Sequence, residues 1–128
     1  MGTAGSSETQ EQQAVIEWAL YARGRYTGLR NLYHVPNEGK RSKSAGGLEK
    51  SLGLSRGVPD LILDWSAGVY HGLRIEMKYG KNRPTQEQED WLRRLDAAGY
   101  CTAVCWSAME AIAVITAYMN LKENERLK

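Results

Sequence analysis

The spacing of apolar residues divides the chain into segments of two kinds. Three segments have apolar residues three or four positions apart, which is typical of helices, and four are short apolar runs, which favour strands. In chain order the pattern predicts a helix capped at Ser7 or Thr9 and ending near Ala22, strands over residues 28–35, 58–65 and 69–79, a helix over 85–98, a strand over 100–106, and a helix from Ser107 to about Asn120. Because Ser66-Ala67-Gly68 is a turn signal, the second and third strands are expected to form a hairpin. The predicted order is α-β-β-β-α-β-α, which indicates an α/β fold.

A polar, basic and glycine-rich stretch over residues 36–56 separates the first predicted strand from the second. We expect a long loop here, with one helical turn around residues 48–52, and a loop of this length in a compact domain is usually functional. The small polar residues at the start predict a disordered N-terminus over residues 1–7. The rest of the sequence predicts one domain over residues 8–122 and a tail over residues 123–128.

The composition is that of an ordinary globular domain, because the 128 residues are 42% hydrophobic and 25% charged. No apolar run approaches the length of a membrane span, and no signal peptide opens the sequence. The two cysteines, Cys101 and Cys105, are too few for a disulfide framework. Their place on one face of a predicted strand favours small core residues over zinc ligands. We therefore expect a protein of a reducing cytoplasm, with no membrane partner.

Basic residues are unevenly distributed, although the formal net charge is only +2. Residues 23–56 contain eight basic and two acidic side chains, whereas residues 84–128 contain five basic and seven acidic ones. Clustering of this kind predicts that one part of the surface attracts a polyanion, and the alternative is a solvated basic loop.

Asp60, Glu76 and Lys78 are the candidate catalytic side chains. Glu76 and Lys78 point to the same face of the third predicted strand, because side chains alternate along a strand. If Asp60 lies on the neighbouring strand, its carboxylate can meet that of Glu76, and two such carboxylates repel each other unless a cation lies between them. Hard oxygen ligands of this kind suit Mg²⁺ or Mn²⁺, with the Met77 carbonyl as a third oxygen and Lys78 placed to orient a water or neutralise charge. The alternative is an ordinary ion pair between Glu76 and Lys78.

Gln88 is a further candidate, because it lies in the first turn of the helix that follows the third strand. An amide at a helix N-terminus can hydrogen-bond a phosphate or a water, and the alternative is an exposed polar residue. His34 and Asn37 follow the first predicted strand toward the basic loop, where they could touch a phosphate or a metal-bound water. For His34 the alternative is a packed strand histidine.

Five short motifs spread along the chain together resemble one protein family. They are Glu8-Thr9-Gln10-Glu11-Gln12, His34-Val35-Pro36-Asn37, Gly57-Val58-Pro59-Asp60-Leu61, Ile75-Glu76-Met77-Lys78, and residues 85–92 with Gln88, followed by Gly99-Tyr100. On these residues the chain resembles the stand-alone phage or bacterial form of the virus-type replication-repair nuclease (VRR-NUC) domain, in the PD-(D/E)xK nuclease superfamily. The resemblance covers about residues 8–106 and implies a restriction-endonuclease-like αβββαβ core, here with an additional C-terminal helix.

The resemblance also implies that the protein is a metal-dependent, structure-selective endonuclease, which hydrolyses phosphodiester bonds in branched DNA. The implied catalytic residues are Glu8, Asp60, Glu76, Lys78 and Gln88, with Asp60, Glu76 and Met77 holding Mg²⁺ or Mn²⁺. Glu11 and Glu17 are the alternatives to Glu8, which is favoured because Gln12 follows it four residues later, as in the family. The contacts of the long loop are not carried over from the family; from its basic residues and from Asn37 beside it, the expected DNA contacts are Asn37, Lys40, Arg41 and Lys43.

Relatives of the stand-alone form act as dimers similar to Holliday junction resolvases, so a homodimer acting on a four-way junction in a bacterial or phage-infected cell is expected here. Two symmetric cuts need two sites related by a two-fold axis, and one chain carries one site. The apolar last helix offers a surface for a second subunit. Two other functions stay open: a restriction-type endonuclease that reads sequence with the loop over residues 36–56, and a DNA-binding module without catalysis. The intact set of Asp60, Glu76 and Lys78 argues against the module.

Overall fold

The computed structural model describes residues 7–36, 53 and 56–127, so the helical turn expected near residues 48–52 lies outside the described residues. The elements, in chain order, are α1 (Glu8–Ala22), the short 3-10 helix η1 (Thr27–Asn31), β1 (Leu32–His34), β2 (Leu61–Leu63), β3 (Leu73–Met77), α3 (Gln86–Ala97), β4 (Cys101–Cys105) and α4 (Ala108–Met119). The predicted order α-β-β-β-α-β-α is confirmed, with η1 as an addition.

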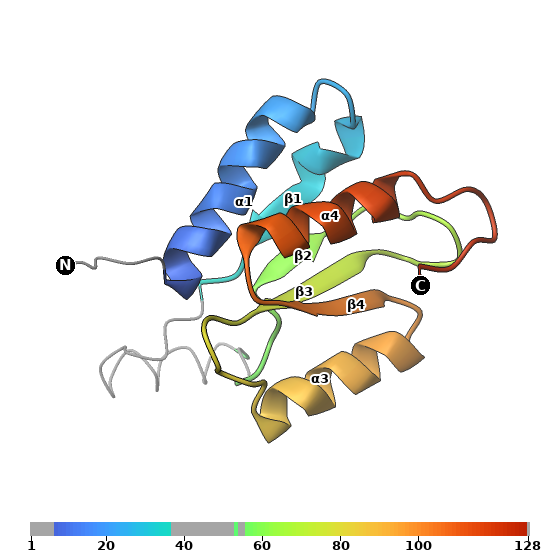
Figure 1. Ribbon diagram of the computed structural model, residues 1–128. Helices are drawn as coiled ribbons and strands as arrows, with labels where there is room; N and C mark the ends of the chain where they lie inside the picture. The colour runs from blue at the N-terminus through green and yellow to red at the C-terminus, as the bar shows by residue number, and fades with distance from the viewer. Residues whose placement is uncertain (1–6, 37–52, 54–55, 128) are drawn as a thin grey trace.

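The strands form one mixed sheet in the order β1-β2-β3-β4. The β1–β2 and β2–β3 pairs are antiparallel, which confirms the predicted hairpin, and β3 and β4 are parallel. Figure 1 shows α1 and α4 together on one face of the sheet and α3 on the other. The molecule therefore has three layers, and the sheet has two unlike faces.

The hydrophobic core lies between the sheet and the layer of α1 and α4. Leu73, Ile75 and Met77 of β3 are at most 1% exposed and pack with Val15 of α1 and Ile115 of α4. Burial of each large aliphatic side chain stabilises the fold by about 1.5–3 kcal/mol before the loss of conformational entropy. Because these residues alternate along β3, the even-numbered side chains of the strand are directed to the opposite face, which α3 only partly covers.

Three side-chain caps set the starts of the helices. Ser7 accepts a hydrogen bond from the Gln10 N–H, and Ser107 accepts one from the Glu110 N–H. Thr85 opens α3 in the same way and belongs to a capping box. The caps at Thr85 and Ser107 were expected from the sequence, and the structure selects Ser7 over the alternative Thr9 for the first helix.

The first predicted strand, over residues 28–35, is only partly correct, because Thr27–Asn31 form η1 and β1 is limited to Leu32–His34. The Leu29 N–H donates to the Tyr26 carbonyl 3.0 Å away, which is a turn bond and not a ladder bond. Leu29 is 3% exposed, so the turn buries its side chain without a strand.

The other strands are also shorter than predicted. Pro59 has no N–H to donate to a ladder, and β2 begins only at Leu61. The predicted strand over residues 69–79 starts at Leu73, because Ala67 and Tyr70 form an isolated bridge inside the β2–β3 connection.

The last described residues lie against that connection. Residues 123–127, predicted as a tail, contain the Glu125 carbonyl, which accepts from the Val69 N–H at 3.0 Å, and the Leu127 N–H, which donates to the Tyr70 hydroxyl at 3.1 Å. Among the described residues, no helix combines the length and the hydrophobicity that crossing a membrane would need.

Candidate active site

The candidate active site lies at the end of the sheet where β2 begins and β3 finishes. Asp60 directly precedes β2, Glu76 lies on the face of β3 opposite the core, and Lys78 directly follows β3 with its side chain near Glu76. The exposed fractions of the three side chains are small: 6% for Asp60, 1% for Glu76 and 7% for Lys78. The structure thus brings the three predicted residues together in one buried place.

A tight turn before β2 aims Asp60 at β3. Gly57 has φ +88°, and a Cβ there would lie 2.7 Å from the carbonyl group of Glu87, so only glycine fits between this turn and α3. The Asp60 carbonyl accepts from the Val35 N–H at 2.8 Å, and its Oδ2 accepts from the Met77 N–H at 2.7 Å. Asp60 is therefore fixed through both its backbone and its carboxylate.

Glu76 has too little positive charge around it to compensate a buried carboxylate. The Lys78 Nζ lies 3.7 Å from Glu76 Oε2, whereas Glu76 Oε1 is buried and has no hydrogen-bond partner among the described residues. Burial first, and then the nearby charge of Asp60, raise the pKa of Glu76 to about 9. Burial also raises the pKa of Asp60, although the Met77 N–H acts in the opposite direction. One lysine is not enough for two buried carboxylates.

A divalent cation would supply the missing positive charge, and the donors present fit one. Carboxylate oxygens and a backbone carbonyl are the ligands that Mg²⁺ prefers, and the unpartnered Glu76 Oε1 is a free buried acceptor. No group of three or more His, Cys, Asp or Glu side chains in the described part of the chain is arranged to hold a metal. Because Mg²⁺ commonly keeps several waters and takes only one or two protein carboxylates, Asp60 and Glu76 would be enough to hold such an ion.

The three glutamates of α1 lie in different environments. The charge of Glu8 raises the pKa of both Asp60 and Glu76, which places it near the site. Glu11 Oε1 instead accepts a hydrogen bond from the Ala108 N–H at 2.7 Å, which gives a partner to one of the free N–H groups in the first turn of α4. Glu17 is exposed to solvent. This arrangement supports Glu8 as the first-helix carboxylate of the site.

Gln88 lies next to the Gly57 turn that precedes Asp60, but part of its side chain already has a structural task. Its Oε1 accepts from the Thr85 N–H at 2.8 Å while Thr85 Oγ1 accepts from the Gln88 N–H, which completes the capping box of α3. Only the amide NH₂ of Gln88 is left to donate to a substrate. His34 is exposed at the end of β1.

The expected DNA contacts cannot be placed in this structure. They are Asn37, Lys40, Arg41 and Lys43, all outside the described residues.

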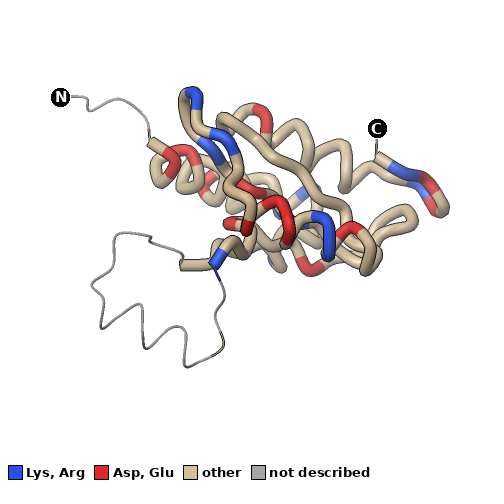
Figure 2. The backbone as a smooth tube through the Cα atoms, turned by 90° about the horizontal axis from the view of Figure 1, so that it is seen from below, with Lys and Arg blue, Asp and Glu red and all other residues tan. Residues whose placement is uncertain are grey.

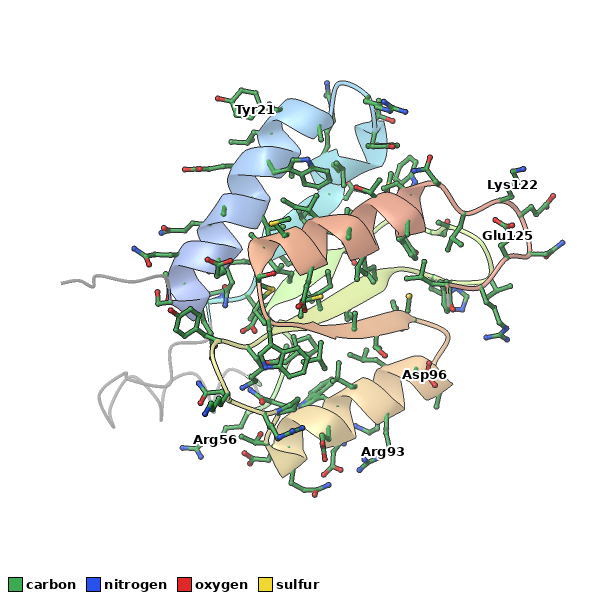
Figure 3. The ribbon with its side chains drawn as sticks, viewed as in Figure 1. Tyr21, Arg56, Arg93, Asp96, Lys122 and Glu125 are labelled. Carbon is green, nitrogen blue, oxygen red and sulfur yellow. The ribbon has the colours of Figure 1, made fainter. Side chains whose placement is uncertain are left out.

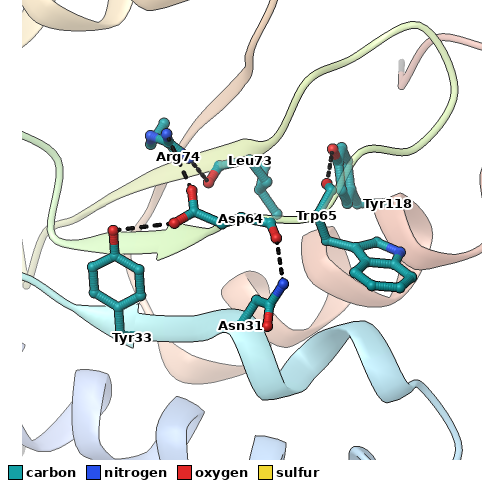
Figure 4. Close-up of polar contacts among 7 residues, drawn as sticks. All are labelled: Asn31, Tyr33, Asp64, Trp65, Leu73, Arg74 and Tyr118. Carbon is teal, nitrogen blue, oxygen red and sulfur yellow. Dashed lines mark hydrogen bonds and ion pairs between the residues drawn. The ribbon is translucent and has the colours of Figure 1, made fainter.

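One polar network at the opposite end of the sheet was not anticipated. Asp64 accepts from the Tyr33 hydroxyl at 3.2 Å and forms an ion pair with Arg74 at 3.4 Å, and its backbone carbonyl accepts from the Asn31 side chain at 2.7 Å (Figure 4). The network joins β1, β2 and β3 across their shared face and thereby supports the register that brings Asp60 beside Glu76. Because side chains alternate along a strand, residues 60, 62 and 64 share one face, and this pattern could have placed Asp64 on the same face as Asp60.

The fold and the site define a nuclease domain of the PD-(D/E)xK type, in which Pro59-Asp60 and Glu76-Met77-Lys78 are the defining residues. The family model of the VRR-NUC domain matches residues 6–109. A solved structure described as a VRR_NUC domain protein is 32% identical to this chain, covers 93% of both chains and superposes with a TM-score of 0.78. No curated protein matches the chain. The chain belongs to the VRR-NUC family.

Proposed function

We propose that this protein is a Mg²⁺- or Mn²⁺-dependent endonuclease that cuts branched DNA, such as a Holliday junction, as a homodimer. The observation that carries the proposal is the buried group of Asp60, Glu76 and Lys78, in which two carboxylates face each other with one acceptor oxygen unpartnered. An ordinary surface ion pair would be exposed and weak, whereas this group is almost completely removed from water.

In this proposal Asp60, Glu76 and the Met77 carbonyl hold the metal. When bound, such a metal supplies an activated water and stabilises the charge that develops on the phosphate. Lys78 keeps its ammonium group beside Glu76 and is placed to orient the attacking water and to neutralise the phosphate. The Gln88 NH₂ donates to a phosphate oxygen from the first turn of α3, where the helix dipole also favours negative charge. Glu8 contributes a third carboxylate from α1.

The homodimer follows from the number of sites. Each chain carries one such group, and two symmetric cuts in a four-way junction need two groups related by a two-fold axis. On α4, Ala111, Ile115 and Tyr118 are buried in the core, while Met109 is 82% exposed near the active-site end of the helix. An exposed methionine there is available for contact with a second subunit.

The decisive test compares DNA structures of the same sequence. A four-way junction, a linear duplex and a single strand are incubated with the wild-type protein in EDTA and in Mn²⁺, and Asp60→Ala and Glu17→Ala are the active-site and surface controls. We expect Mn²⁺-dependent cutting, fastest on the junction, that Asp60→Ala abolishes and Glu17→Ala leaves intact. Asp60→Ala should still bind DNA, because phosphate contacts supply most of the affinity.

Each other outcome points to a different function. Cutting of duplex at a fixed sequence would favour a restriction-type endonuclease, and binding without any cutting would favour a silent module. Cutting by Asp60→Ala at saturating Mn²⁺ would refute the site assignment.

A further inference from the structure

The loop that connects β3 to α3 leaves directly from the candidate active site and is basic. Residues 79–84 follow Lys78 and contain Lys81 and Arg83, and no acidic residue occurs between Glu76 and Glu87. Lys81 and Arg83 are both exposed, and no described carboxylate forms an ion pair with either. Within the described part of the chain, the positive charge of the loop is therefore not compensated by an ion pair.

Two hydrogen bonds at Asn82 hold this loop in place. The Asn82 N–H donates to the Tyr79 carbonyl at 3.1 Å, which closes a turn, and the Trp106 indole N–H donates to the Asn82 carbonyl at 2.8 Å. Gly80 has φ +63°, a backbone conformation that favours glycine. A Cβ at this position would have no atom within 4 Å, so the preference for glycine comes from the backbone conformation and not from steric crowding. The loop is a formed structure that displays Lys81 and Arg83.

A third basic residue reaches the same region from the turn before β2. Arg56 is exposed and precedes Gly57, which packs against the backbone of the first turn of α3. Figure 3 shows Arg56 near the start of α3, far from Lys122 and Glu125 at the other end of the molecule. We call Arg56, Lys81 and Arg83 the basic rim. Figure 2, seen from the α3 side, shows Lys and Arg positions interspersed with Asp and Glu positions along the backbone.

The rim lies within reach of the phosphates next to the one that would be cut. Lys81 is three residues from Lys78, so their Cα atoms are at most about 11 Å apart. A DNA strand carries one phosphate per about 3.4 Å of helix axis, so a strand whose scissile phosphate lies at Lys78 has its next phosphates beside the loop. An exposed, fixed arginine or lysine at this distance suits a phosphate oxygen.

We propose that the basic rim binds the phosphates that flank the scissile phosphodiester on the cut strand, and so sets which bond enters the site. This inference rests on the proposed nuclease function and adds the strand contacts that position its substrate. Lys81 and Arg83 contact the phosphates on one side of the cut, and Arg56, from the other connection, contacts the strand across the start of α3.

The first test measures the salt dependence of DNA binding, with the full chain carrying Asp60→Ala so that no DNA is cut. Kd for a duplex and a four-way junction is measured by fluorescence anisotropy between about 50 and 200 mM salt, the range over which phosphate binding changes affinity most visibly. Changing Arg56, Lys81 and Arg83 to alanine should lower the slope of log K against log salt by about 0.9 for each phosphate that the protein no longer neutralises, or about 2.7 for all three on duplex DNA. The matched control changes the exposed Arg93, Lys122 and Arg126 to alanine and should leave the slope unchanged.

The second test asks whether the basic rim contacts the phosphate next to the cut on the cleaved DNA strand. A neutral methylphosphonate replaces the phosphate next to the cut, and affinity is compared for the Asp60→Ala protein with and without the rim substitutions. The intact rim should lose affinity on the modified strand, and the substituted rim should show no further loss.

An equal loss of affinity on the modified strand in both proteins would contradict the proposal that the basic rim binds the flanking phosphates. A salt slope unchanged by the three rim substitutions would contradict it as well. Equal cutting of duplex and junction by the wild-type protein would refute the branched substrate of the proposed function instead, while the duplex salt slope still decides whether the basic rim binds DNA. Circular dichroism confirms that each variant is folded before binding is measured.

Discussion

Replacing Glu76 with glutamine is expected to stabilise the metal-free protein at neutral and alkaline pH. Burial and the nearby Asp60 raise the pKa of Glu76 from its ordinary value of 4.5 to about 9. A carboxyl whose pKa is raised by folding takes up its proton more readily in the folded state. The stability of the folded state is therefore highest below pH 4.5 and is lost as the pH rises toward 9. Glutamine removes this dependence because it carries no charge at any pH.

The size of the effect follows from the width of this pH window. Each pH unit inside it costs about 1.4 kcal/mol, so between about pH 5.5 and 7.5 the wild-type protein should lose on the order of 3 kcal/mol relative to Glu76→Gln. For a domain of this size, a change on the order of 3 kcal/mol corresponds to a difference on the order of 10 °C in Tm.

Urea unfolding in EDTA across this pH range measures the difference, with the exposed Glu17→Gln as the matched control. Glu17→Gln should follow the wild-type profile. Mn²⁺ should restore the stability of the wild-type protein at pH 7.5 and have little effect on Glu76→Gln. Identical pH profiles for wild type and Glu76→Gln would refute the account of two uncompensated buried carboxylates.

The remaining predictions concern the lysine, the turn and the long loop. Lys78→Ala should lower the cleavage rate more than the Mn²⁺ affinity, because a charged ammonium cannot ligate a metal; isothermal titration of Mn²⁺ checks this, and a large drop in binding would contradict it. Gly57→Ala should destabilise the protein by about 1–3 kcal/mol in urea unfolding, because φ is +88° and the new Cβ would meet the α3 backbone at 2.7 Å; wild-type stability would argue against that packing. Neutralising Lys40, Arg41 and Lys43 together should lower the salt slope of DNA binding by about 0.9 for each phosphate no longer neutralised, and an unchanged slope would place the DNA elsewhere.

The element order could be predicted because its signals are local. Ser7, Thr85 and Ser107 mark helix starts through hydrogen bonds within one turn, and the turn at residues 66–68 marks the hairpin. Thr85 and Gln88 also follow the capping-box spacing, which predicts the structural task of Gln88 as directly as its position predicted a catalytic one. Strand ends were less predictable, because they depend on pairing partners distant in sequence.

The family spacing to Gln12 favoured Glu8 among the glutamates of α1, but the different environments of the three side chains could not be predicted from local sequence. Glu8, Glu11 and Glu17 lie on one helix, and what separates Glu8 from Glu11 is a hydrogen bond between Glu11 and Ala108, 97 residues away. The hydrogen bond between Asp60 and the Met77 N–H likewise depends on the register of β2 and β3. Asp60, Glu76 and Lys78 themselves could be predicted, because alternation along one strand and a hairpin partner were enough to bring them together.

The central claim is that Asp60 and Glu76 hold a divalent cation in this protein. Anomalous diffraction from crystals grown with Mn²⁺ tests it most directly, because it locates the ion independently of any activity. The account predicts a peak within coordination distance of the Asp60 and Glu76 carboxylates and the Met77 carbonyl, and no such peak in Glu76→Gln crystals. A peak at another place, or none at a Mn²⁺ concentration that supports cleavage, would contradict it.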